Sequence, residues 1–186
     1  MSLRSTLIAS LTIASFTLPA QASQDTDPVF VFNRICYAQV PNVDAIRSMA
    51  LKLAWKQMGG EDLQRFASVD NPKSLDGWDA QVGERIYRVG LVQSGLTDQM
   101  KETFPGFANG KATSCTLVLD EEHDAAVFSA NMQTLAGKEP ISKDVPEDGL
   151  RTTTWAGGND SLKVFLISKA EASGRGGVLS VTVLEK

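Results

Sequence analysis

Residues that build most catalytic and metal sites are scarce in this sequence. Only one of its 186 residues is histidine and only two are cysteine. A histidine-based zinc site needs further histidines as ligands, and the chain has none. It also lacks the G-x-S-x-G motif of serine hydrolases and a C-x-x-C redox pair. The sequence therefore predicts no catalytic, cofactor-binding or metal-binding residues.

Basic residues are also few. Eighteen Lys and Arg stand against 22 Asp and Glu, which gives a net charge of −4. Loss of the N-terminal segment described next would remove Arg4 alone and leave a net charge of −5. Nucleic-acid partners need a basic surface that faces their phosphates. The composition therefore argues against a nucleic-acid partner.

Residues 1–22 are typical of a secretory signal peptide. One positive charge precedes an apolar run that ends in the small-x-small sequence Ala20-Gln21-Ala22. The run is too short and too rich in Ser and Thr for a membrane span, and no second run of spanning length follows. The sequence thus predicts a periplasmic or secreted protein without a transmembrane segment after cleavage. Its mature part, 23–186, has the length of a single domain.

The two cysteines, Cys36 and Cys115, form an even pair in a chain predicted to be exported. Such a pair is typical of one disulfide. The bridge would close a loop of about 80 residues, worth roughly 4–5 kcal/mol in the chain-entropy model and often less in practice. Free thiols and a redox role are the alternatives, and the missing C-x-x-C argues against the second.

Hydrophobic periodicity divides the chain into helices and strands. Asp27-Pro28 is typical of a helix start, and 42–60 carries a helical apolar stripe that ends at a glycine pair. The alternation of 85–95 is typical of a strand. The predicted order is ααβββαβββ: an α+β domain with a mostly antiparallel sheet of five to six strands, on which two N-terminal helices and one middle helix pack. The predicted helices are 28–40, 42–60 and 121–136, and the predicted strands are 78–82, 85–95, 112–120, 150–156, 161–170 and 177–186.

The only histidine, His123, lies in the acidic stretch LDEEHDAAV. Metal ligands on a helix need partners three or four residues apart, but Leu119 and Val127 occupy the positions four residues away. Asp120 is a typical helix N-cap, and the acids after it suit the positive end of the helix dipole. We therefore expect a helix that begins after Asp120, with His123 in solvent. A weak divalent-cation site made by the acids is the alternative.

The stretch TFPGFANGK is a candidate recognition loop. Phe104 and Phe107 flank Pro105-Gly106 in it. Aromatic side chains on a glycine-rich loop can form a recognition tip because binding residues often lie on loops. The alternative is that both rings fold back and cover a sheet edge.

Two arginines, Arg85 and Arg88, lie in the predicted strand 85–95. The alternation of a strand places Arg88 on one face with Ile86 and Val92. We expect Arg88 to line a polar spot on the sheet.

A resemblance covers most of the mature chain. Phe and Cys in the first helix, a tryptophan strand, SCTLVL before a helix ending in LAGKEP, and then TTTWAGG, LKVFLIS and GGVLSVTV follow each other. This pattern resembles a group of small exported proteins of alphaproteobacteria. The resemblance implies a periplasmic or secreted α+β domain with a cysteine staple, and it brings no catalytic residues.

The absence of a catalytic constellation favours a non-catalytic binding or interaction domain, whose partner would be an envelope protein or another envelope component. Two alternatives stay open. One is a cell-envelope hydrolase whose paired carboxylates are far apart in the sequence, as in glycosidases. The other is an inhibitor of an exported hydrolase.

Overall fold

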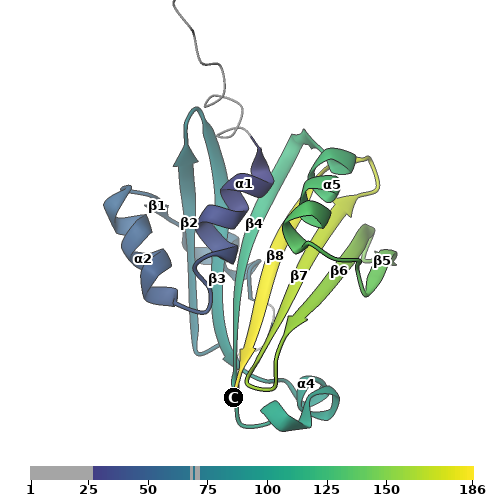
Figure 1. Cartoon of the computed structure of the whole chain (residues 1–186). Coiled ribbons are helices and arrows are strands. Elements are labelled where there is room, and N and C mark those ends of the chain that lie inside the picture. Colours follow the sequence, from purple (N-terminus) through teal and green to yellow (C-terminus); the bar gives the residue numbers. More distant parts are fainter. Residues whose placement is uncertain (1–26, 68, 70–71) are drawn as a thin grey trace, which may run out of the picture.

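The computed structural model describes residues 27–67, 69 and 72–186, so the predicted signal peptide lies outside the described residues. Eight antiparallel strands form one sheet in the order β1-β2-β3-β4-β8-β7-β6-β5 (Figure 1). The strands are β1 Lys56–Gln57, β2 Ser74–Val82, β3 Arg85–Gly95, β4 Lys111–Asp124, β5 Ser142–Glu147, β6 Leu150–Gly158, β7 Leu162–Glu171 and β8 Arg175–Glu185.

Within the described residues, five α-helices accompany the sheet. Two of them, α3 and α4, are short helices that add to the three counted in the predicted fold. α1 runs on into a π-helical turn, η1, and α4 is followed by a 3₁₀ turn, η2. The helices are α1 Pro28–Phe32, η1 Asn33–Tyr37, α2 Val43–Lys52, α3 Gly60–Gln64, α4 Asp98–Thr103, η2 Pro105–Phe107 and α5 Ala125–Ala136.

The α+β class is right, but the prediction of five to six strands and three helices is wrong. The six predicted strands exist, and β1 and β5 join them at the two edges of the sheet. β5 is exposed along most of its length. An edge strand that buries no side chains is held by backbone hydrogen bonds, so its sequence shows no alternation of apolar and polar residues. The predicted helix over 42–60 ends early, at Lys52.

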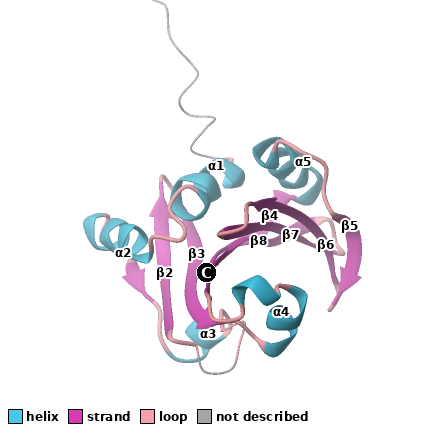
Figure 2. Cartoon of the chain, turned by 60° about the horizontal axis from the view of Figure 1, so that its bottom comes forward, coloured by secondary structure: helices cyan, strands magenta, loops and turns pink. Residues whose placement is uncertain are grey.

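The helices cover opposite faces of a curved sheet. Figure 2 shows α1 and α5 on the convex face, whereas α4 lies under the arch formed by β4, β8, β7 and β6. The main core lies between the convex face and the helices α1 and α5. Phe32 and Phe128 from these helices are buried there against Leu117 of the central strand β4.

The predicted disulfide is confirmed and crosses this core. Cys36 of η1 is bonded to Cys115 of β4, with an S–S distance of 2.00 Å and a Cα–Cα distance of 5.3 Å. Both residues have no exposed surface. The bridge therefore fixes the first helical segment on the centre of the sheet.

On the concave face, two glycines of the sheet contact the segment that contains α3. Gly77 and Gly90 are paired neighbours on β2 and β3. A side chain at Gly90 would collide with the ring of Phe66, and a Cβ at Gly77 would lie 2.8 Å from Cδ1 of Leu63. The two glycines thus let α3 and the turn after it lie against the backbone of the sheet. This segment forms one wall of the groove described next.

Candidate ligand-binding groove

Four side chains form a row across the concave face of the sheet. Arg88 on β3 is the pairing partner of Val118 on β4, which pairs with Val178 on β8, which pairs with Lys169 on β7. Residues in direct register point to the same face, and neighbouring strands lie about 4.8 Å apart. Two valines therefore form a floor between two basic side chains. The alternation of β3 places Arg88 as the sequence predicts.

Hydroxyl groups occupy the next positions along the same strands. The Oγ1 atom of Thr116 lies 2.9 Å from Oγ of Ser180, and Ser114 Oγ lies 2.8 Å from Thr182 Oγ1. In each pair one hydroxyl donates to the other. The second hydroxyl of the Thr116–Ser180 pair thus keeps its proton for an acceptor in the space above the sheet.

A cavity of about 370 Å³ lies above this part of the face. Its floor includes Thr116, Ser180 and the two valines, and Arg88 and Lys169 line it as well. Its wall comes from the α3 segment and consists of Asp62, Arg65 and Phe66.

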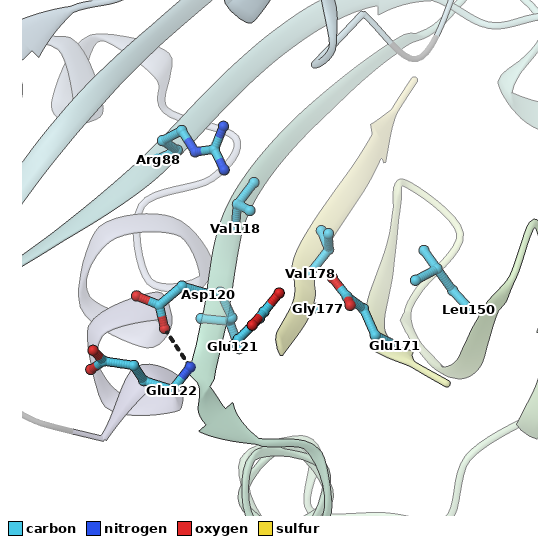
Figure 3. A pocket seen from close by; sticks show the side chains of 10 residues that line it. Arg88, Val118, Asp120, Glu121, Glu122, Leu150, Glu171, Gly177 and Val178 are labelled. Atoms are coloured by element: carbon cyan, nitrogen blue, oxygen red, sulfur yellow. Dashed lines mark hydrogen bonds between the residues drawn. The ribbon is translucent and has the colours of Figure 1, made fainter. Parts of the chain in front are cut away.

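A second cavity, of about 610 Å³, continues from the first. Both share Arg88, Val118 and Val178, so they form one groove. Figure 3 shows Glu121 of β4 and Glu171 of β7 extending toward each other across β8. The groove is thus basic beside α3 and acidic at the other end. The remaining lining residues of this second cavity are Leu119, Asp120, Glu122, Leu150 and Gly177.

Arg88 stands out among the basic residues of the groove because it has no hydrogen bond or ion pair with any described residue. Lys169, in contrast, lies 2.9 Å from Glu147, which also accepts a hydrogen bond from Thr152. The hydrogen bond from Lys169, followed by that from Thr152, lowers the pKa of Glu147 below its ordinary value. The exposed Arg88 guanidinium therefore has neither a hydrogen-bond acceptor nor an ion-pair partner among the described residues, whereas Arg65 of the same groove lies 4.0 Å from Asp62.

A third cavity, of about 670 Å³, lies on the other face between α5 and β6. Its buried polar groups are satisfied: Trp155 Nε1 donates to Gln133 at 3.0 Å, and Thr153 Oγ1 accepts from the Asp144 backbone N–H at 3.2 Å. Neither of these buried groups needs a ligand. The concave groove is for this reason the stronger candidate.

The structure corrects the prediction for the acidic stretch. β4 continues through it, and α5 begins at Ala125 with Asp124 as its N-cap, accepting from the backbone N–H groups of Ala126 and Val127. Asp120 is not the cap. His123 is only 7 % exposed, so the prediction of a solvated histidine is also wrong.

His123 is buried because β4 continues beyond Asp120, to Asp124, and the His123 ring packs near Tyr87. The centroids of the two rings are 5.7 Å apart. The Nδ1 atom of His123 lies 2.8 Å from Asp120 Oδ1, and its Nε2 lies 3.3 Å from Arg85 Nη1. A guanidinium can only donate. Nε2 therefore accepts, and Nδ1–H donates to Asp120. Burial raises the pKa of the neighbouring Tyr87 hydroxyl.

The candidate recognition loop folds back onto the sheet. Phe107 is 5 % exposed and packs in a second core with Leu96, Ala112 and Leu184. Phe104 is half-buried, with its ring centroid 5.5 Å from that of Phe165. Phe107 thus folds back as the alternative interpretation has it, but it packs with Ala112 and Leu184 of the central strands β4 and β8 rather than at an edge of the sheet. Its ring is not available at the surface.

The sequence predicts a polar spot at Arg88 but does not predict the rest of the groove. Thr116 and Ser180 are 64 positions apart and become neighbours only through the pairing of β4 with β8. Glu121 and Glu171 meet across β8, because β8 pairs with both β4 and β7. Strand alternation could have placed each residue on a face, but the strand order decides which residues meet.

Two general properties concern the described part of the chain. No group of three or more His, Cys, Asp or Glu side chains in it could hold a metal ion. None of its helices has the length and apolar character needed to cross a membrane.

Comparison with known proteins gives no relative: no family model matches the chain, and neither a curated protein nor a solved structure is significantly similar to it. The resemblance to exported alphaproteobacterial proteins therefore stays a prediction.

Proposed function

We propose that the protein is an exported, non-catalytic binding domain that holds a component of the cell envelope in the concave groove. The disulfide Cys36–Cys115 is compatible with an oxidising, exported location, since such bonds persist outside the cytosol. The two parts of the groove, about 370 and 610 Å³, lie in the size range of small-molecule sites.

The observation that carries this proposal is the unpaired Arg88 at the junction of both cavities. A guanidinium presents five donors in a planar fork, which suits an anionic group with two acceptor oxygens. Among the described residues, none supplies such a group to Arg88. A ligand with an anionic group would satisfy these donors.

The position of the groove also supports binding. Its floor belongs to β4 and β8, which lie in the middle of the sheet and pair over most of their length. On the opposite face the disulfide fixes β4 to η1. A floor on rigid central strands is formed before the ligand arrives, which reduces the entropic cost of binding.

The test uses the low-molecular-mass fraction of a periplasmic extract, added to the ¹⁵N-labelled protein. We expect amide chemical-shift changes at Thr116, Val118, Val178 and Ser180, and their loss in Arg88→Gln. The matched control is Arg151→Gln, because Arg151 is an exposed arginine whose strand register places it on the convex side. Shift changes confined to other parts of the protein would contradict the proposal.

A hydrolase is the second candidate, because Glu121 and Glu171 converge on one cavity (Figure 3). Carboxylate pairs of this kind act in glycosidases, where one carboxyl group must lie in apolar surroundings to serve as the acid. Both glutamates here are exposed, which favours the binding function. Hydrolysis of envelope glycans by the protein, abolished in Glu121→Gln and in Glu171→Gln, would favour the enzyme instead.

A further inference from the structure

We propose that the groove selects a zwitterionic ligand of dipeptide size, with its carboxylate at Arg88 and its ammonium group between Glu121 and Glu171. This inference rests on the proposed binding function and specifies its ligand class. Three side chains without ion-pair partners among the described residues carry it: the cation Arg88 and the anions Glu121 and Glu171, which line one cavity.

The carboxylate end is defined by Arg88 and the hydroxyl pair Thr116–Ser180. All three residues line the smaller part of the groove. The guanidinium can hold both oxygens of a carboxylate, and the free hydroxyl proton of the pair gives a further donor. Arg65 lines the same cavity, and its nearest carboxylate, Asp62, is 4.0 Å away. Because Asp62 lines the cavity too, these two charges offset each other, and Arg88 is the cation that defines this end.

The ammonium end is defined by Glu121 and Glu171. Neither side chain has a hydrogen bond or ion pair with a described residue. The neighbouring acids are occupied: Asp120 accepts from His123, and Glu122 lies 3.3 Å from Arg85. Two unpaired carboxylates that face one space repel each other, and a cation between them removes that repulsion.

The spacing of the two ends follows from the strands. Glu171 lies two residues beyond Lys169, which belongs to the row of Arg88. Two strand residues span about 7 Å along the sheet, and the midpoint between Glu121 on β4 and Glu171 on β7 lies two strand spacings, about 10 Å, across the sheet from Arg88 on β3. The two ends are therefore roughly 12 Å apart, which an extended dipeptide of about 7 Å covers with a hydrogen bond of about 3 Å at each end. Val118 and Val178 lie between the ends and offer an apolar floor to short side chains.

The same charges disfavour other anions. A doubly charged phosphate at Arg88 would meet the two free carboxylates and the further acids of the rim. No ion pair joins Arg88 to any of these acids within the described residues. A zwitterion is the ligand that compensates both ends of the groove at once.

The experiment compares three probes that differ only at their ends: L-alanyl-L-alanine, its N-acetyl form and its C-terminal amide. Each is titrated into the ¹⁵N-labelled protein, with its disulfide intact, at low ionic strength. We expect the free dipeptide to shift the groove amides with an affinity about fivefold or more above that of either blocked form. Equal affinity for the free and a blocked form would overturn the inference.

Two variants test which residues bind the carboxylate and which bind the ammonium group of the dipeptide. Arg88→Gln should remove the preference for the free dipeptide over its amide, while the double variant Glu121→Gln/Glu171→Gln should remove the preference over the N-acetyl form. Arg151→Gln and Glu102→Gln, exposed residues outside the groove, should keep both preferences. A preference that survives in its matched variant would also overturn the inference.

Failure of this inference differs from failure of the proposed function. If no dipeptide form shifts the groove, the zwitterion is excluded as the ligand class. The periplasmic fraction then still tests the groove itself through Arg88→Gln. Only the absence of groove shifts with that fraction would contradict the binding function.

Discussion

The Nδ1 atom of His123 lies 2.8 Å from Oδ1 of Asp120, and this contact joins a buried ring to a carboxylate that lines the acidic end of the groove. Asp120 also accepts from the backbone N–H of Glu122 at 3.0 Å. One carboxylate thus orders the end of β4. The acidic stretch is thus the end of β4, where Asp120, Glu121 and Glu122 line the groove, and α5 begins only after Asp124.

Replacement of His123 by Ala should destabilise the protein. The variant loses two hydrogen bonds and the packing of a buried ring on Tyr87. We expect the free energy of unfolding to fall by about 1–3 kcal/mol, a range usual for loss of a buried polar group with its partners. Urea denaturation measures this change. A loss below about 0.5 kcal/mol, typical of surface substitutions, would show that the ring is solvated.

Gly90→Ala tests the close contact between Phe66, which follows α3, and the backbone of β3. The added methyl group would collide with the Phe66 ring, so the segment must move away from the sheet. We expect a loss of about 1–3 kcal/mol, the usual cost of overpacking, measured by thermal and urea unfolding. Gly95→Ala is the matched control, since a Cβ there has no neighbour within 4 Å. Equal stability of the two variants would contradict the close contact.

Phe107→Ala should cost far more than Phe104→Ala. Phe107 is buried in the second core beside Leu184, whereas Phe104 is half-buried against Phe165. Removing a buried phenylalanine typically costs about 3–5 kcal/mol. Unfolding experiments on both variants provide the comparison. Similar small losses for both would indicate that the two rings are exposed in solution.

Removal of the disulfide should destabilise the protein without changing its fold. Cys36 and Cys115 are 79 residues apart in the sequence. The chain-entropy model gives about 4–5 kcal/mol for a loop of this length, and measured values are often lower. The double variant Cys36→Ser/Cys115→Ser should show this loss relative to the oxidised wild type. Insensitivity of the wild type to reductant during unfolding would contradict it.

Glu147 should contribute to stability above its ordinary pKa of about 4.5 and lose that contribution in acid. Lys169 and Thr152 lower its pKa in the folded protein, so the folded state binds its proton less readily than the unfolded chain. The contribution is complete above the unfolded value and disappears as the pH falls through the lower folded value. Glu147→Gln should therefore flatten the stability profile below about pH 5. An unchanged slope there would show that the pair with Lys169 does not form.

Local sequence signals were sufficient for the elements that bury a face. The alternation of 85–95 matches β3, and the even pair of Cys36 and Cys115 matches the observed bridge. β5 escaped prediction because an exposed edge strand has no burial pattern. Asp120 and Asp124 are chemically equivalent N-cap residues, so the sequence could not choose between them.

The sequence by itself determined the α+β class, the cysteine pair and the face on which Arg88 lies, because each depends on residue types and on periods of two or 3.6 residues. Tertiary structure alone decided the burial of His123 and Phe107 and the meeting of Thr116 with Ser180 and of Glu121 with Glu171. These relationships depend on the strand order β3-β4-β8-β7. That order arises from pairing between strands far apart in the chain, for which no local pattern exists.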